Sequence, residues 1–140
     1  NICAGIGRGQ MEVLESRVSL RSAMHDFYVG LFKDISGVSI FTTPNEDYLS
    51  NYWLSAIVIE PQLTNGIDRE VVRLAFEAEN IESRPLWKPM HLQPVFEDYP
   101  YYGTNIAETL FEKGLCLPSG SNLTDEDRGR ISNVIFKLFH

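Results

Sequence analysis

The sequence is poor in cysteine, in basic residues and in long apolar runs. Its two cysteines, Cys3 and Cys116, lie far apart in the sequence and do not match the spacing of a metal site. We therefore expect free thiols, no bound metal and a reducing, cytoplasmic location. No apolar run is long enough to cross a bilayer. Twelve basic against 19 acidic residues give a net charge of −7, which argues against nucleic-acid or membrane partners.

Catalytic signatures are also missing. The sequence shows no nucleophile beside a base, no paired carboxylates and no phosphate-binding glycine loop. His25, in the middle of a predicted helix, and His140, at the C-terminus, have no evident partners, and we interpret Cys116 as a core residue. We therefore expect no catalytic residue in this chain, and any reactive group would come from elsewhere.

Length and composition fit one domain. The chain has 140 residues, of which 44% are hydrophobic and 22% charged, values typical of a globular protein with a real core. The chain starts at Asn1, inside a predicted helix, so we expect a piece of a longer protein whose missing part lies upstream.

The periodicity of the apolar residues predicts an α+β fold. Residues 1–34 carry an apolar stripe at steps of three and four, which predicts one helix about 45–50 Å long, lying across a second domain or a partner subunit. Four helices around a small, mostly antiparallel sheet are expected in total. The further predicted elements are strands at 38–41 and 52–60, a helix at 68–80 capped by Asp68, a helix at 104–113 closed by Gly114, an extended segment at 115–118, and a helix from Thr124 with Asp127 in a capping box.

The segment from Glu82 to Phe96 is the most distinctive part of the sequence, and we call it the proline arm. Pro85, Pro89 and Pro94 exclude an α-helix and favour extended backbone. Cationic, aromatic and amide side chains stand between the prolines: Arg84, Trp87, Lys88, His91 and Gln93. Such a set suits an anionic ligand that carries a flat ring. The alternative is a connector whose Trp87 and Phe96 fill a core while its charges are solvated.

Three blocks in series resemble a known family. Ile2–Leu14 (ICAGIGRGQMEVL), Arg84–Pro94 (RPLWKPMHLQP) and Gly114–Gly120 (GLCLPSG), the last followed by Leu123–Asp127 (LTDED), are similar to the C-terminal small domain of the DegT/DnrJ/EryC1/StrS sugar aminotransferases. The resemblance covers nearly the whole chain. It implies a homodimeric, pyridoxal-phosphate-dependent transaminase of fold type I. The enzyme would pass an amino group, typically from glutamate, to a nucleotide-linked keto-deoxysugar for surface polysaccharides or glycoproteins.

The resemblance also implies a division of labour. The family's cofactor domain, with the lysine that binds pyridoxal phosphate, has no counterpart in these 140 residues, so we expect this chain to be inactive alone and to bind no cofactor. In the family the proline arm lines the entrance for the sugar nucleotide. The residues expected to bind substrate are, in order, His91, Lys88, Arg84 and Trp87, with Gln93. Two alternatives stay open: a dehydratase of the same family, and a non-catalytic α+β module that dimerises through its first helix.

Overall fold

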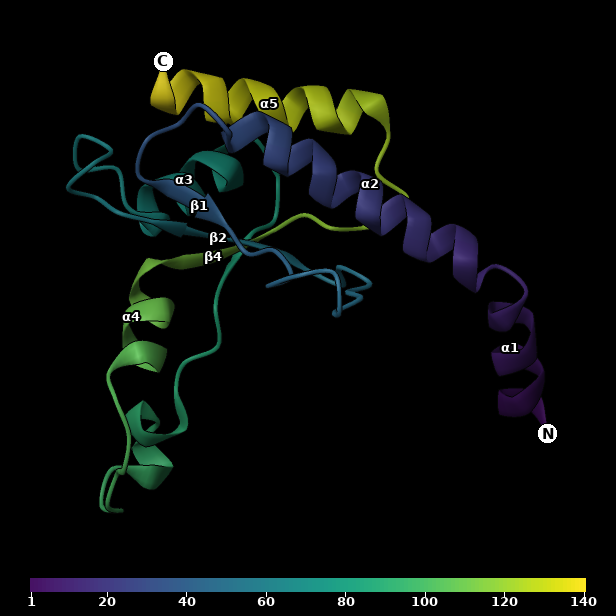
Figure 1. Cartoon of the computed structure of the whole chain (residues 1–140), viewed down its shortest axis with the longest axis horizontal. Coiled ribbons are helices and arrows are strands. Elements are labelled where there is room, and N and C mark those ends of the chain that lie inside the picture. The colour runs from purple at the N-terminus through teal and green to yellow at the C-terminus, as the bar shows by residue number, and fades with distance from the viewer.

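A four-stranded antiparallel sheet with helices packed on it forms the body of the computed structural model, which describes residues 1–140 (Figure 1). The strands run in the order β1-β2-β4-β3, with Ile57 opposite Leu115 at the centre. The α+β prediction is confirmed. The elements are α1 (Ile2–Met11), α2 (Leu14–Phe32), β1 (Val38–Ile40), β2 (Ser55–Ile59), α3 (Arg69–Ala78), β3 (Arg84–Pro85), α4 (Ile106–Lys113), β4 (Gly114–Leu117) and α5 (Asp125–Phe139), with 3-10 turns η1 (Met90–Leu92) and η2 (Pro94–Phe96) between β3 and α4.

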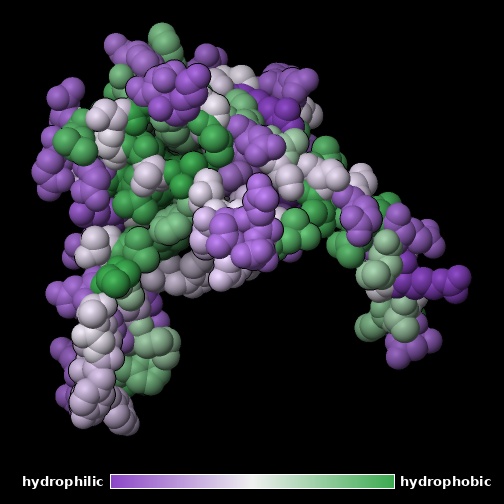
Figure 2. Space-filling view, viewed as in Figure 1, coloured by the Kyte–Doolittle hydropathy of each residue, from purple (hydrophilic) through white to green (hydrophobic).

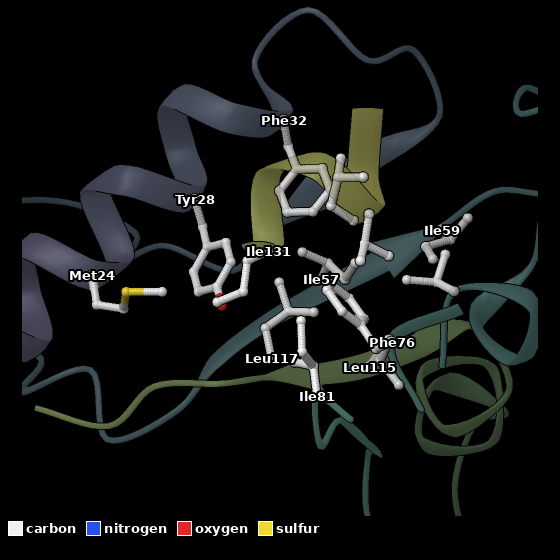
Figure 3. Packing of buried hydrophobic residues seen from close by; sticks show 13 residues of the cluster. Met24, Tyr28, Phe32, Ile57, Ile59, Phe76, Ile81, Leu115, Leu117 and Ile131 are labelled. Atoms are coloured by element: carbon white, nitrogen blue, oxygen red, sulfur yellow. The ribbon is translucent and has the colours of Figure 1, made fainter. Parts of the chain in front are cut away.

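The core lies where α2, α3 and α5 meet the sheet (Figure 3). Tyr28, Phe76 and Ile57 are fully buried there, and alternate residues of β2 point into it. All four residues of β4 are buried, as expected of a central strand. Thirteen apolar residues form one cluster. At about 25 cal/mol per Å² of apolar area removed from water, such a cluster is the main source of stability.

Local capping chemistry sets two helix starts as predicted. Asp68 accepts hydrogen bonds from the amides of Glu70 and Val71, both at 2.9 Å, and starts α3. At α5 the Thr124 hydroxyl accepts from the Asp127 amide, while the Asp127 carboxylate accepts from the Thr124 amide at 2.9 Å. This capping box also holds the pKa of Asp127 below its ordinary value, because the ionised carboxylate is the form that accepts these bonds.

The prediction of one helix over residues 1–34 is wrong. The chain leaves the helical path at Glu12–Val13 and continues as α2 in a new direction, so the structure has five α-helices instead of four (Figure 1). Three glycines lower the helical propensity of α1, and none of its residues is buried, so no packing holds the two helices in line. The stripe becomes a packing face only within α2, where Met24, Tyr28 and Phe32 reach the core.

Two further details differ from prediction. Gly114 does not close α4 in a left-handed conformation, since its φ of −94° and ψ of 141° are extended and it begins β4. The proline arm is not extended throughout, because η1 and η2 interrupt it. Pro89 precedes the first turn and Pro94 opens the second, positions where the ring and the missing N–H cost nothing.

The molecule has the shape of an arch. The proline arm and α4 project from one side of the sheet, and α1 projects beyond the far end of α2 (Figure 1). The space-filling view shows these two projections standing apart below the body (Figure 2). None of the helices combines the length and the apolar character needed to cross a bilayer.

Candidate functional site

The proline arm begins as the edge strand of the sheet. Arg84 pairs with Cys116 and Pro85 with Leu115, and the Leu86 amide donates to the Gly114 carbonyl at 3.3 Å. An edge strand is the place in a sheet that tolerates proline, because its outer side needs no N–H donor. The pairing fixes the start of the arm against the buried strand β4.

A cleft of about 540 Å³ opens between the arm and the end of β4. It is lined by Leu54, Glu82, Ser83, Arg84, Pro85, Leu86, Trp87, Cys116, Leu117, Pro118 and Ser119. Trp87 keeps 68% of its surface exposed and does not fill a core, so that part of the connector interpretation is wrong. Half-buried Phe96 instead packs edge-on against Tyr99. Cys116 is buried, as expected of a core residue, and burial raises the pKa of its thiol.

Arg84 and Lys88 are the cations that the arm exposes. The Arg84 Nε donates to Glu82 Oε1 at 2.7 Å, but both side chains are more than 70% exposed, and such surface pairs contribute little. The Lys88 ammonium takes part in none of the ion pairs of the structure. Both cations can therefore exchange water for an incoming anion at small cost.

His91 and Gln93 are engaged within the arm itself. The Nε2 of His91 lies 2.8 Å from Glu108 Oε1 on α4, and its ring stacks on Tyr101 with centroids 3.7 Å apart. Gln93 Nε2 donates to the Lys88 carbonyl at 3.3 Å. His91 thus ties η1 to α4, while Gln93 closes the turn that carries Lys88. Of the five predicted binding residues, Arg84 and Trp87 line the cleft, and Lys88 follows Trp87 in the sequence. His91 and Gln93 instead bind partners within the chain.

Sequence reasoning missed Trp53 as a site residue. The apolar run placed it within a strand over residues 52–60, but β2 begins only at Ser55 and Trp53 is 63% exposed. Its ring centroid lies 6.4 Å from that of Trp87, with the planes tilted by 35°. The neighbouring Leu54 lines the cleft. Two exposed indoles next to a cation form a surface suited to a flat, charged ligand.

The comparisons with known proteins agree with these blocks and this fold. The DegT/DnrJ/EryC1/StrS aminotransferase family matches residues 1–136. The chain belongs to this family. The match runs without interruption from the first helix through the proline arm to most of α5, so the three blocks quoted above lie within one match to the family.

Relatives in this family cover the chain almost end to end. EpsN from Bacillus subtilis, assigned to the pyridoxal phosphate-dependent aminotransferases, is 38% identical over 144 residues, covering 100% of this chain and 36% of EpsN. GDP-perosamine synthase from Escherichia coli is 30% identical over 126 residues, covering 90% of the chain and 32% of that enzyme. The chain therefore spans about a third of the length of the curated relatives it matches.

Solved structures of aminotransferases share the fold. A DegT/DnrJ/EryC1/StrS aminotransferase from Brucella abortus superposes with a TM-score of 0.77 at 25% identity, over 94% of this chain and 33% of that one. The aminotransferase TlmJ from Streptoalloteichus hindustanus reaches a TM-score of 0.81 at 20% identity, with coverage of 94% and 34%. The arrangement of five helices and four antiparallel strands is thus a fold found in family members.

Proposed function

We propose that this chain is the C-terminal small domain of a pyridoxal-phosphate-dependent transaminase that aminates a nucleotide-linked keto-deoxysugar. The carrying observation is the 38% identity with EpsN along the whole chain. The name of GDP-perosamine synthase, a second relative, describes an amino sugar linked to a nucleoside diphosphate. We propose glutamate as the amino donor, and we propose that the amino sugar is used in the synthesis of surface polysaccharides or glycans.

We assign no residue of this chain to the cofactor. Of its four lysines, Lys113 is paired with Glu60 at 2.7 Å and Lys137 with Glu79 at 3.3 Å, while Lys33 and Lys88 stand exposed at the end of α2 and on the arm. Pyridoxal phosphate, held elsewhere in the full-length protein, would supply the chemistry that moves the amino group. On this assignment the chain alone is inactive.

The role proposed for this chain is to hold and orient the sugar nucleotide. Arg84 and Lys88 offer fixed positive charge to the diphosphate, and Trp87 offers a face to a ring. His91 and Gln93 are kept in the proposed binding set, but their partners indicate that they act by shaping the arm. A charge-assisted hydrogen bond contributes about 1.5–3 kcal/mol, so two cations can account for a substantial share of substrate affinity.

The test uses the full-length protein that contains this chain. With glutamate and a nucleotide-linked 4-keto-deoxysugar, we expect the product to gain an amino group by mass spectrometry, whereas a dehydratase would remove a sugar oxygen. Arg84→Ala with Lys88→Ala should raise KM at least about tenfold and leave kcat nearly unchanged. The matched control, Lys33→Ala with Lys137→Ala, removes the same charge from outside the arm and should leave KM unchanged. No amino transfer to any nucleotide-linked keto sugar would refute the proposal.

We also propose that α1 is covered when the full-length protein assembles as a homodimer. Ile2 is 83% and Ile6 60% exposed, and α1 has no buried residue, so its apolar side chains face water in this chain. Sedimentation of the full-length protein should give a dimer. A monomer at micromolar concentration would contradict this part of the proposal.

A further inference from the structure

Trp53 is turned away from the face that its strand position predicts. Ser55, Ile57 and Ile59 are buried, so strict alternation would place Trp53 on the same inner face. Tyr52 breaks the alternation, because its φ of +45° lies in the left-handed region that residues with a side chain rarely adopt. As a result Trp53 points outward, while Tyr52 lies against α2.

Two side chains before Tyr52 hold this turn locally. The Ser50 hydroxyl accepts from the Tyr52 amide at 3.1 Å, and the side-chain Oδ1 of Asn51 accepts from the Trp53 amide at 3.1 Å. Both bonds span two residues, the pattern by which serine and asparagine favour turns over strands. The sequence Ser50-Asn-Tyr-Trp53 therefore encodes its own departure from β2.

Two residues of α2, one helical turn apart, hold the same turn from outside. A guanidinium nitrogen of Arg21 donates to the Trp53 carbonyl and, at 3.2 Å, to the carbonyl of Ser119, which follows β4. The His25 ring stacks on Tyr52 with centroids 3.8 Å apart and planes within 18°. Its Nε2–H donates to the Phe41 carbonyl at 3.0 Å, which fixes the ring. Several contacts thus converge on presenting one exposed indole.

We propose that Trp53 and Trp87 form the stacking site for the nucleobase of the sugar nucleotide, and that Arg21 is a positioning residue for Trp53. This inference rests on the proposed function. Every nucleobase has a flat π face, and stacking on indole tolerates any base. The phosphates attached to a base bound here would lie near Arg84, which lines the same cleft as Trp87. Large apolar surface held out in water by this many contacts is explained by a ligand that covers it.

The experiment measures Kd by calorimetry on the full-length protein, with GDP as one probe and inorganic pyrophosphate as the other. Trp53→Ala should weaken GDP binding about 5- to 100-fold, the range that stacking of one base supports, and leave pyrophosphate binding unchanged. Trp53→Phe keeps a flat ring and should stay within about threefold of wild type. Arg21→Gln should weaken GDP binding in the same base-dependent manner. Tyr48→Ala, an exposed aromatic of the same loop, is the control and should change neither.

The outcomes separate this inference from the proposal on which it rests. If wild type binds GDP and Trp53→Ala binds it equally well, the stacking site is wrong and the proposed function stands. Equal losses for GDP and pyrophosphate would mean that Trp53 only supports the fold, which also overturns the inference. If wild type binds neither GDP nor a sugar nucleotide, the proposed function itself fails.

Discussion

Gly114→Ala tests how closely the proline arm packs on the sheet. A Cβ built on Gly114 would collide with Leu86 Cδ1 and with the Leu110 carbonyl oxygen, and would lie 2.7 Å from Leu86 Cγ. The φ of −94° is open to alanine, so the penalty is steric and not conformational. One obstacle is backbone, which cannot rotate away as a side chain can.

The expected cost follows from overpacking of a buried site. Extra methyl groups in packed interiors typically destabilise by about 1–3 kcal/mol, and we expect about 2–3 kcal/mol here. With a urea m-value of about 1.5 kcal/mol per M, the unfolding midpoint should fall by about 1.3–2 M. The assay is urea unfolding of the 140-residue chain followed by circular dichroism.

The matched control is Gly129→Ala on α5, where an added Cβ meets nothing within 4 Å. In a helix interior this change should stabilise by about 0.5–1 kcal/mol. A second check is Leu86→Ala in the Gly114→Ala background, which should recover part of the loss, since contacting residues couple. Equal midpoints for Gly114→Ala and wild type would refute the packing described here, and a missing coupling would show that Leu86 is not the neighbour.

Further predictions address the caps and the buried polar groups. Thr124→Ala should lower the unfolding free energy by about 1 kcal/mol in urea titrations. Because the folded pKa of Asp127 is depressed, its contribution is present above about pH 4 and is lost as the pH falls through the folded pKa, so Asp127→Asn should flatten the acid limb of a stability–pH curve. Iodoacetamide should alkylate exposed Cys3 well before Cys116, whose pKa burial raises, as mass spectrometry would show. Tyr28→Phe removes a 2.8 Å hydrogen bond to the Pro118 carbonyl and should cost about 1 kcal/mol in thermal unfolding.

Local chemistry made much of the fold predictable. Asp68 and the pair Thr124 with Asp127 mark helix starts through bonds to their own backbone, which depend on only three or four residues. The strand at 52–60 was predicted from its apolar run, and β2 lies at the centre of the sheet as expected. Such signals survive tertiary packing because they are satisfied within one turn or one pair of strands.

The errors arise where distant contacts decide. The position of Gly114 after Lys113 predicted a left-handed helix cap. In the structure the absence of a side chain at Gly114 lets Leu86 pack against the backbone there. The break at Val13 has no proline to announce it and follows from the absence of packing on α1. Neither fact is visible in residues near in sequence, because one depends on a segment about thirty residues upstream and the other on whether the rest of the chain packs against α1.

The candidate site shows the same division. The sequence ranked His91 ahead of Lys88 as a binding residue, yet only the fold places Glu108 and Tyr101 around the histidine and leaves the lysine exposed. Whether a polar residue binds a ligand or holds the arm in place depends on the partners that folding brings next to it. On this basis we propose Lys88 before His91 as a direct contact of the substrate. His91→Gln should mainly displace the arm, because it alters the contacts of His91 with Glu108 and Tyr101.

Trp53 was placed within the predicted strand over residues 52–60 although the sequence contained a signal against that placement. Ser50 and Asn51 stand directly before it, and both are residues whose side chains compete with strand hydrogen bonds. Period-2 reasoning carries the inner face of β2 back to Trp53 only if the backbone stays extended at Tyr52, and the turn formers remove that condition. An aromatic residue that follows Ser-Asn and precedes a buried strand should therefore be considered for the surface as well as for the core. Here Trp53 is exposed and lies beside Trp87, where the proposed ligand would bind.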